Sequence, residues 1–322
     1  MTVVTQYEKA GVNIKAGEWL VDRIKKVSPT IGGFAGIYRL DDTRSLVACT
    51  DGVGTKLEIG IAMERYEDLG QDLVAMNLND LIVCGARPLF FLDYFATGRL
   101  DVDIAHRVIK GIIKACQDHS CLLLGGETAE MPGFYDNNKF DLAGFAVGEV
   151  LNNSIIDGKK IKSGDLIFGF PSNGFHANGY SLIRKLLQTH NISLNSTIEG
   201  EILGDYLTKP TKLYVNEILN LKSQIKIKGM AHITGGGLSN ITRVLPENLI
   251  FEIEKNKIPT HPIMNYFQKL GAISDEEAYN VWNMGVGFVI IIDPSDSVNI
   301  KSLCPSCFEF GIVSNLNKTQ KQ

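Results

Sequence analysis

The residues best suited to chemistry lie in one short segment, Asp51-Gly52-Val53-Gly54-Thr55-Lys56, directly after the apolar run 45–50. Glycines let a backbone approach an anion closely, a lysine places positive charge on phosphate oxygens, and a carboxylate binds hard cations. The spacing differs from a Walker A loop, and Leu57 replaces the third glycine of a Rossmann fingerprint. The segment predicts a phosphate and metal site; the alternative is a strand-ending turn with a surface lysine.

A second carboxylate, Asp80, lies on a helix predicted over residues 69–85. The spacing places Leu73, Asn77, Asp80 and Cys84 on one face of that helix. Burying an unpaired carboxylate there would cost several kcal/mol, so we expect a cation, a polar network or a water-filled cleft to face it. The alternative is a cap or a hydrogen-bond network in which Asp80 serves folding alone.

A third carboxylate, Glu127, belongs to the glycine turn 125–133, which follows the apolar run 121–124. Asp51, Asp80 and Glu127 are oxygen ligands of the kind that magnesium takes together with nucleotide phosphates. With Lys56 beside Asp51 in the sequence, the set predicts a metal–nucleotide site in the first half of the chain.

Two turns in the second half are suited to anions. The turn 171–181 is rich in glycine, amides and hydroxyls before a predicted helix, and its His176 could move a proton near neutral pH. The turn 232–238 offers Thr234 and three glycine amides. Together they suggest a phosphorylated substrate besides the nucleotide. The alternative is that both are connectors and that His176 is a hydrogen-bonded loop residue.

Composition limits the classes of protein. The 322 residues are 44% hydrophobic, and 32 basic against 36 acidic residues give a net charge of −4. We therefore expect no nucleic-acid or membrane partner, and a small molecule as ligand. Residues 1–6 lack the regions of a signal peptide, so we expect the cytoplasm. The six cysteines suit buried thiols, and Cys304-Pro305-Ser306-Cys307 is an isolated C-x-x-C whose role the sequence leaves open.

Strand and helix patterns alternate along the chain, which predicts an α/β (α+β) fold with two α/β domains, 1–160 and 161–322. The predicted helices cover residues 17–26, 69–85, 103–120 and 179–188. The predicted strands cover 45–50, 89–95, 121–124, 166–170, 228–233 and 288–292. A glycine-rich loop lies at 32–36. The short connection near residue 160 favours packed domains over a flexible linker.

Several motifs recur in an order and spacing typical of one enzyme family. They are YEKAGV at 7–12, TDGVGTK at 50–56, DLVAM at 72–76, NDL at 79–81, PLFFLDY at 88–94, GGETAEMPG at 125–133, NGYSL at 178–182 and HITGGGL at 232–238. With them the chain closely resembles the phosphoribosylformylglycinamidine cyclo-ligases, also called aminoimidazole ribonucleotide synthetases. The resemblance spans nearly the whole chain and is more specific than any single loop.

The resemblance implies a reaction of purine biosynthesis, in which ATP activates the formyl oxygen of formylglycinamidine ribonucleotide as a phosphate ester. An amidine nitrogen then closes the imidazole ring, with release of ADP and phosphate. It also implies a homodimer whose N-terminal halves pair strands into an intersubunit barrel, with nucleotide near the subunit interface. The C-terminal half is expected to hold a mixed sheet with helices.

The resemblance also assigns roles to residues, with ATP and Mg²⁺ as cofactors. His176, Asp80 and Lys56 are expected in catalysis, and Asp51, Asp80 and Glu127 on the metal. The expected nucleotide contacts are Lys25, Gly32, Gly33, Gly36, Asp51, Gly52, Gly54, Thr55, Lys56, Asn178, Thr234, Gly235 and Gly236. Phe175 and Ala177 stand where relatives often carry proline and serine, which bears on the geometry of the His176 loop.

The same superfamily leaves rival functions. Selenophosphate synthetase would carry a reactive cysteine or selenocysteine in its N-terminal glycine loop, whereas the first cysteine here is Cys49. A hydrogenase-maturation enzyme would end in cysteine, and this sequence ends in Gln322. The remaining alternatives are another phosphoryl-transfer enzyme of the superfamily and a non-catalytic nucleotide-binding regulator.

Overall fold

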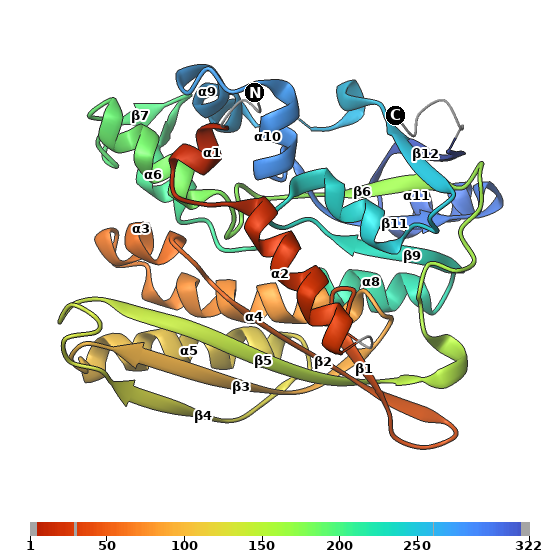
Figure 1. Cartoon of the computed structure of the whole chain (residues 1–322), viewed down its shortest axis with the longest axis horizontal. Helices are drawn as coiled ribbons and strands as arrows, with labels where there is room; N and C mark the ends of the chain where they lie inside the picture. Colours follow the sequence, from red (N-terminus) through yellow and green to blue (C-terminus); the bar gives the residue numbers. More distant parts are fainter. Residues whose placement is uncertain (1–4, 29–30, 260, 317–322) are drawn as a thin grey trace.

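The structure of the chain, a computed structural model, describes residues 5–28, 31–259 and 261–316. Two five-stranded sheets form its two halves, and long helices lie between them (Figure 1). The first sheet takes its strands from residues 36–151 and the second from residues 166–315. The expected α/β class, with a sheet and helices in each half, is therefore confirmed. None of the described helices is both long and apolar enough to cross a membrane.

The first sheet is mostly antiparallel. Its order is β1 (Gly36–Arg39), β2 (Arg44–Gly52), β5 (Phe140–Leu151), β3 (Arg87–Thr97) and β4 (Leu122–Glu130). Only β3 and β4 run parallel, and the helix α5 (Val102–Asp118) makes the crossover that a parallel pair requires. Asp101 begins this helix by accepting the N–H groups of Asp103 and Ile104.

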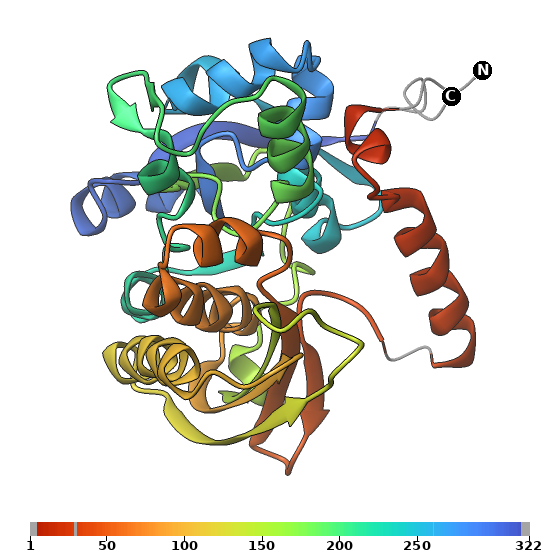
Figure 2. The same cartoon turned by 90° about the vertical axis from the view of Figure 1, so that its left-hand side faces the viewer.

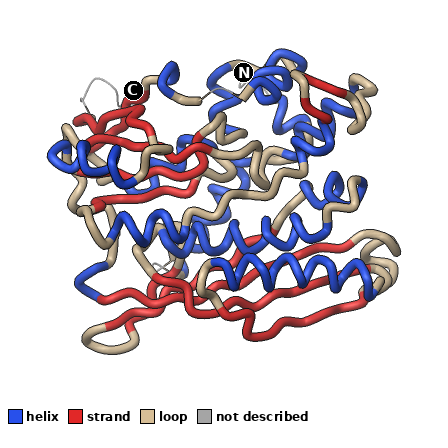
Figure 3. The backbone as a smooth tube through the Cα atoms, turned by 180° about the vertical axis from the view of Figure 1, so that it is seen from behind, coloured by secondary structure: helices blue, strands red, loops and turns tan. Residues whose placement is uncertain are grey.

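Helices cover only one face of the first sheet. The helices α4 (Tyr66–Ile82) and α5 lie against each other on that face, and Figure 3 shows both between the two sheets. Val47, Phe91 and Ala146 point to these helices and are fully buried. The opposite face is open: Leu122 is 61% exposed there, and Phe145 is 42% exposed.

The second sheet has the order β10 (Leu249–Ile253), β12 (Phe308–Asn315), β6 (Leu166–Pro171), β11 (Val286–Ile292) and β9 (Ile227–His232). We expected a mixed sheet, and this was wrong, because each described pairing of its strands is antiparallel. The strands β6 and β9 run in the same direction but do not pair, since β11 lies between them. Every residue of β9 and β11 is buried.

Shorter elements surround the second sheet. They are α6 (Tyr180–Thr189), β7 (Thr197–Ile198), β8 (Glu201–Ile202), α7 (Leu203–Leu207), α8 (Val215–Lys222), η2 (Gly237–Val244), η3 (Lys255–Lys257), α9 (Pro262–Leu270), α10 (Asp275–Val281), η4 (Pro294–Asp296) and α11 (Ser297–Leu303). The turn η1 (Asn152–Ser154) begins the connection between the halves, and the predicted domain boundary at 160 falls within that connection.

The N-terminal segment belongs to neither sheet, although its first helix contacts the second half. The short helix α1 (Gln6–Lys9) leads into α2 (Ile14–Val27), which Figure 2 shows running alongside the body of the molecule. Several apolar side chains of α2 are exposed, among them Trp19 and Val27. The glycine-rich segment after α2 then enters β1.

Most predicted elements are present with shifted ends. The helix expected over 69–85 is α4 at Tyr66–Ile82, and the strand expected over 45–50 is β2 at Arg44–Gly52. Asp51 therefore belongs to a strand rather than to a turn. The helix α4 is buried on nearly all sides, including its polar residues Asp72, Asn77 and Asn79, because the second half packs on the side away from the sheet.

Candidate active site

Two of the predicted metal ligands, Asp51 and Asp80, come together between β2 and α4. Asp51 faces α4, since its cross-strand partner Gly144 lies against Asn77 and Leu73 of that helix. Burial, followed by the negative charge of Asp80, raises the pKa of Asp51 to about 6. Two carboxylates that repel each other away from water favour a cation between them.

A buried histidine, His232 at the end of β9, joins this pair from the second half. Its Nδ1 lies 2.8 Å from Oδ1 of Asp80, and its Nε2 lies 3.4 Å from Nδ2 of Asn79. The side chain of His232 is fully buried. Sequence reasoning named the glycine turn after His232 but not the histidine itself. The available signal was a histidine at the end of an apolar strand, directly before the glycine triplet.

An open cleft of about 1120 Å³ reaches Thr50, the neighbour of Asp51 in β2, although neither Asp51 nor Asp80 lines it. Its walls come from α2, the glycine segment 31–38, Cys49 and Thr50 of β2, and the η2 region. Six expected nucleotide contacts line it: Lys25, Gly32, Gly33, Gly36, Gly235 and Gly236. The cleft thus joins the glycine loop of the first half with a glycine turn of the second.

Arg243 of η2 adds a positive charge to this cleft. Its guanidinium lies over the ring of Phe34, 5.1 Å from the centroid, and its charge lowers the pKa of Asp51 against the larger effect of burial. Arginine is always protonated and donates in a fork that matches phosphate oxygens. Arg243 is therefore a second candidate that sequence reasoning missed, since nothing in the motif spacing brings it near Asp51.

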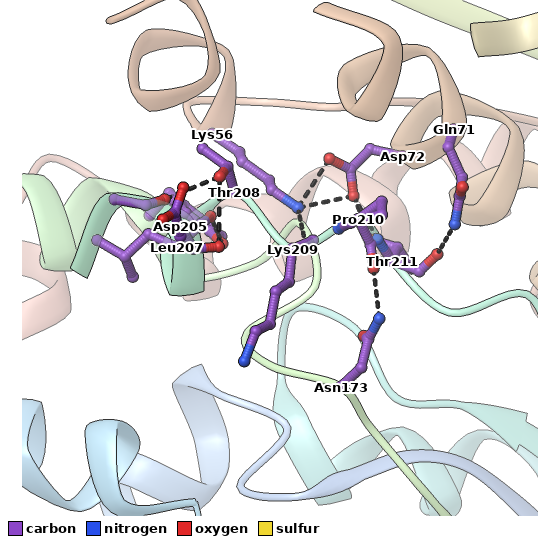
Figure 4. A network of polar contacts seen from close by, with 12 residues as sticks. Lys56, Gln71, Asp72, Asn173, Asp205, Leu207, Thr208, Lys209, Pro210 and Thr211 are labelled. Atoms are coloured by element: carbon purple, nitrogen blue, oxygen red, sulfur yellow. Dashed lines mark hydrogen bonds and ion pairs between the residues drawn. The ribbon is translucent and has the colours of Figure 1, made fainter. Parts of the chain in front are cut away.

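Lys56 lies elsewhere, in a buried network shown in Figure 4. Its Nζ is 2.7 Å and 2.8 Å from the two carboxylate oxygens of Asp72 and 2.7 Å from the carbonyl oxygen of Lys209. Thr211 donates its N–H and its hydroxyl to the same carboxylate. Both charged side chains are fully buried. Lys56 thus donates to Asp72 and to Lys209 inside the protein and is fully buried, so the lysine is neither at the cleft nor on the surface.

The residues just before Lys56 also lie away from the cleft. Gly52 ends β2, and a Cβ on it would lie 2.9 Å from the carbonyl oxygen of Leu142. Gly54 has the positive φ of +71° that the turn into α3 (Lys56–Ala62) requires. The hydroxyl of Thr55 lies 3.0 Å from that of Ser181, in the first turn of α6. Thr55 lines a separate pocket near α1 and α6.

His176 is fully buried and has a left-handed backbone, with a φ of +59°. Neither of its ring nitrogens has a hydrogen-bond partner among the described residues. Burial, with the neighbouring charges of His232 and Lys56, holds the pKa of His176 well below its usual value. The ring is therefore neutral at physiological pH. It packs against Tyr214, and it is not among the residues that line the cleft.

The two anion-friendly turns of the second half touch each other. A Cβ on Gly235 would lie 3.5 Å from Oδ1 of Asn178, so Asn178 reaches the glycine turn. The carbonyl oxygen of Thr234 accepts the N–H of Gly237, which closes this turn. Asn178 and Thr234 therefore stand beside the cleft residues Gly235 and Gly236.

Glu127 is not brought together with the other two carboxylates. Along one row of the first sheet, Asp51 pairs with Gly144, Gly144 with Asp93, and Asp93 with Gly126. Three strand spacings of about 4.8 Å separate the ends of this row by about 14 Å. Glu127 pairs with Tyr94, one residue further on, so its side chain points to the open face. Within one chain, Asp51 and Glu127 cannot bind one ion.

Comparison with protein families gives two matches. Residues 32–150 match the N-terminal domain of AIR synthase related protein, and residues 162–309 match its C-terminal domain. A phosphoribosylformylglycinamidine cyclo-ligase of Thermoanaerobacter sp. (strain X514) is 50% identical over 307 residues, which cover 90% of each chain. The chloroplastic enzyme of that name from Arabidopsis thaliana is 48% identical over 91% of this chain and 76% of its own length.

Solved structures share the fold at low sequence identity. The structure of AaThiL complexed with AMPPCP and TMP has a TM-score of 0.67 and 18% identity, covering 92% of this chain and 90% of that one. The hydrogenase maturation protein HypE in complex with ATP has a TM-score of 0.65 and 19% identity, covering 87% of this chain and 80% of that one. Both similarities concern the fold alone.

The buried pair of Lys56 and Asp72 gives a test of the role of Lys56. Replacing Lys56 with Met leaves the carboxylate of Asp72 buried without its cation, which should lower the free energy of unfolding by about 3–5 kcal/mol. Urea denaturation measures this loss. The double variant Lys56→Met with Asp72→Leu should recover much of the stability. Unchanged stability together with weaker nucleotide binding would instead support a direct phosphate contact.

The raised pKa of Asp51 gives a pH-dependent test. Its ordinary value is 3.8 and its value in the folded chain is about 6, so ionised Asp51 disfavours folding above about pH 6. The variant Asp51→Asn should therefore be more stable than the parent at pH 8, by about 1–3 kcal/mol without metal or nucleotide. This gain should disappear as the pH falls from about 6 to about 4. Urea denaturation across this pH range measures the difference in stability between the variant and the parent. A difference that does not change with pH would contradict the raised pKa of Asp51.

Proposed function

Because the chain belongs to the phosphoribosylformylglycinamidine cyclo-ligase family, we propose that it closes the imidazole ring of aminoimidazole ribonucleotide at the expense of ATP. The substrate is formylglycinamidine ribonucleotide, and the reaction is a step of purine biosynthesis. Its formyl oxygen is phosphorylated by ATP, and an amidine nitrogen then displaces the phosphate as the ring forms. The main support for this proposal is the sequence identity of 46–50% to relatives of this name over about nine-tenths of the chain.

The cleft beside Asp51 is our site for ATP. Phosphoryl transfer asks mainly for positioning and for neutralisation of charge. The glycine loop 32–36 and the turn 235–236 offer backbone N–H groups, while Lys25 and Arg243 offer positive charge. The expected contacts Asn178 and Thr234 stand at the second-half wall. Lys56 acts at a distance, by fixing the position of α4.

Asp51 and Asp80 fit a magnesium ion carried by the nucleotide. Magnesium is usually held by one or two carboxylates together with phosphate oxygens and water. No group of three or more His, Cys, Asp or Glu suited to a metal is found in the described part of the chain, so a cage made by the protein alone does not fit. The ion would neutralise phosphate charge during transfer. Asp51 and Asp80 hold it from the protein side.

His176 is our candidate for the base that accepts the proton released on ring closure. A neutral imidazole with an unpartnered nitrogen can accept a proton, and both nitrogens of His176 lack partners among the described residues. In the present arrangement the ring is buried. This role therefore requires that the turn 173–179 opens toward the substrate.

A second copy of the chain on the open face of the first sheet completes our proposal. Leu122, Leu124 and Phe145 expose apolar surface on this face, which favours burial against another protein surface. Thr50, a neighbour of the helix-facing Asp51 in β2, lines the cleft from the same open face. A homodimer with an intersubunit barrel would therefore border the cleft, and it would bring Glu127 of one chain towards the nucleotide site of the other.

The function is tested by release of ADP and phosphate. We expect release only when formylglycinamidine ribonucleotide, ATP and Mg²⁺ are all present. Asp51→Asn should lower turnover severely while remaining folded, and His176→Ala should lower turnover more than nucleotide affinity. Binding of ATP without such release, in a folded sample, would favour a non-catalytic regulator. Release that needs a different phosphate acceptor would favour another enzyme of the superfamily.

The dimer is tested by placing charge on the open face. Phe145→Lys should shift the chain from dimer to monomer in sedimentation experiments, because a lysine would be desolvated in the interface. Val298→Lys is the matched control, since Val298 is also exposed and apolar but lies on α11 of the second half. A parent chain that sediments as a monomer, or a dimer that both variants leave intact, would contradict this interface.

A further inference from the structure

Asp80 is the one carboxylate of the proposed cation site that also contacts the second half of the chain. It lies on α4, and its Oδ1 is 2.8 Å from Nδ1 of His232 on β9. The Asp80 side chain keeps 15% of its surface exposed, whereas His232 has none. No other contact of the Asp80 carboxylate is found among the described residues. Its second oxygen is therefore left for a ligand in the site.

The surroundings of His232 determine which of its nitrogens carries the proton. The backbone N–H of Tyr214 donates to Oδ1 of Asn79 at 3.0 Å, which identifies the other end of that amide as its NH₂ group. This NH₂ donates to the carbonyl oxygen of Lys212 at 2.9 Å and faces Nε2 of His232 at 3.4 Å. Because a donor faces Nε2, Nε2 must be the accepting nitrogen. An N–H group is then on Nδ1, where it donates to Oδ1 of Asp80.

The ring of His232 is held in this orientation from several sides. Packing against Phe288 of β11, with ring centroids 6.3 Å apart, supports one face. Asn79 is itself fixed by two backbone groups of the segment 212–214. A donor whose own position is fixed can fix the carboxylate that it contacts, as buried partners of metal ligands do in general.

We propose that His232 is a positioning residue for the metal–nucleotide site: its Nδ1–H holds Asp80 in the orientation in which Asp80 and Asp51 bind one cation. The second half of the chain would thereby set the geometry of carboxylates that belong to the first half. His232 would touch neither the cation nor the nucleotide. The inference rests on the proposed function only in taking the cation to be the one that ATP carries.

The test compares two variants of His232. His232→Leu removes the donor while keeping an apolar side chain, and His232→Asn keeps an N–H close to the place of Nδ1. We expect His232→Leu to raise the Mg²⁺ concentration needed for half-maximal turnover by about 10- to 100-fold, with kcat at saturating Mg²⁺ changed far less. His232→Asn should recover most of this loss. Equal effects of the two variants, or an unchanged Mg²⁺ requirement in a folded His232→Leu, would overturn the proposal.

A matched control and a cycle separate positioning from folding. His261→Leu also removes a histidine hydrogen bond in the second half, that to the hydroxyl of Tyr206, and should leave the Mg²⁺ requirement unchanged. In the background of Asp80→Asn, His232→Leu should no longer weaken the Mg²⁺-dependent binding of a non-hydrolysable ATP analogue, measured by calorimetry. An undiminished effect of His232→Leu in that background would contradict an action through Asp80.

A measurement without metal or nucleotide keeps the proposal testable if His232→Leu does not fold. Side-chain ¹⁵N NMR of the parent chain should show His232 with a hydrogen on Nδ1 and none on Nε2. The signals of His232 are assigned as those that are missing from the spectrum of His232→Asn. The opposite tautomer would overturn the proposal. If the analogue binds with the expected dependence on His232 but no ring closure occurs, the proposed function fails and this inference stands.

Discussion

Helix α4 carries polar side chains into a buried interface, and each of them needs a hydrogen-bond partner there. The extended segment 208–214 of the second half crosses this interface, and its backbone groups would otherwise stay unpaired at a cost of several kcal/mol. Asp72 accepts from Thr211, while Asn79 bonds with both Lys212 and Tyr214. Side chains of α4 thus supply hydrogen-bond partners to the backbone of the buried segment, as a neighbouring β-strand would. The positions of Asp80 and of the cleft follow from this docking.

The ion pair of Lys56 with Asp72 and the carboxylate of Asp51 are both buried charges, but only the ion pair has a neighbouring charge that neutralises it. Lys56 and Asp72 neutralise each other inside the protein, and both side chains are fully buried, so the pair joins the two halves without facing the cleft. Asp51 accepts the backbone N–H of Gly52, and the distant charge of Arg243 offsets only part of the effect of burial and of the repulsion of Asp80. Burial, followed by the charge of Asp80, raises the pKa of Asp51, and a cation bound there would lower it again.

The sequence predicted the elements and the meeting of Asp51 with Asp80, since apolar runs and helical spacing determine which residues a strand end and a helix face present. It did not predict the buried ion pair of Lys56, because nothing in a motif tells whether a lysine at a helix start turns toward a ligand or toward a carboxylate sixteen residues later in the chain. The sequence also did not predict that Asp51 and Glu127 point to opposite faces of the first sheet. The register between β3 and β4 shifts at Phe91 and Leu92, and a shift by one residue exchanges the faces of a strand.

His232 and Arg243 escaped sequence reasoning for a further reason: the residues that they affect, Asp80 and Asp51, lie more than 150 positions away in the other half of the chain. The same separation explains why the site has to be shared. In the proposed site, the carboxylates lie on the helix side of the first sheet, and the second half, docked on α4, supplies the histidine that contacts Asp80. Glu127 points to the other face of the same sheet, so its side chain cannot reach the cation site of its own chain. A site that uses all three carboxylates therefore needs two copies of the chain, each contributing a different face of its first sheet.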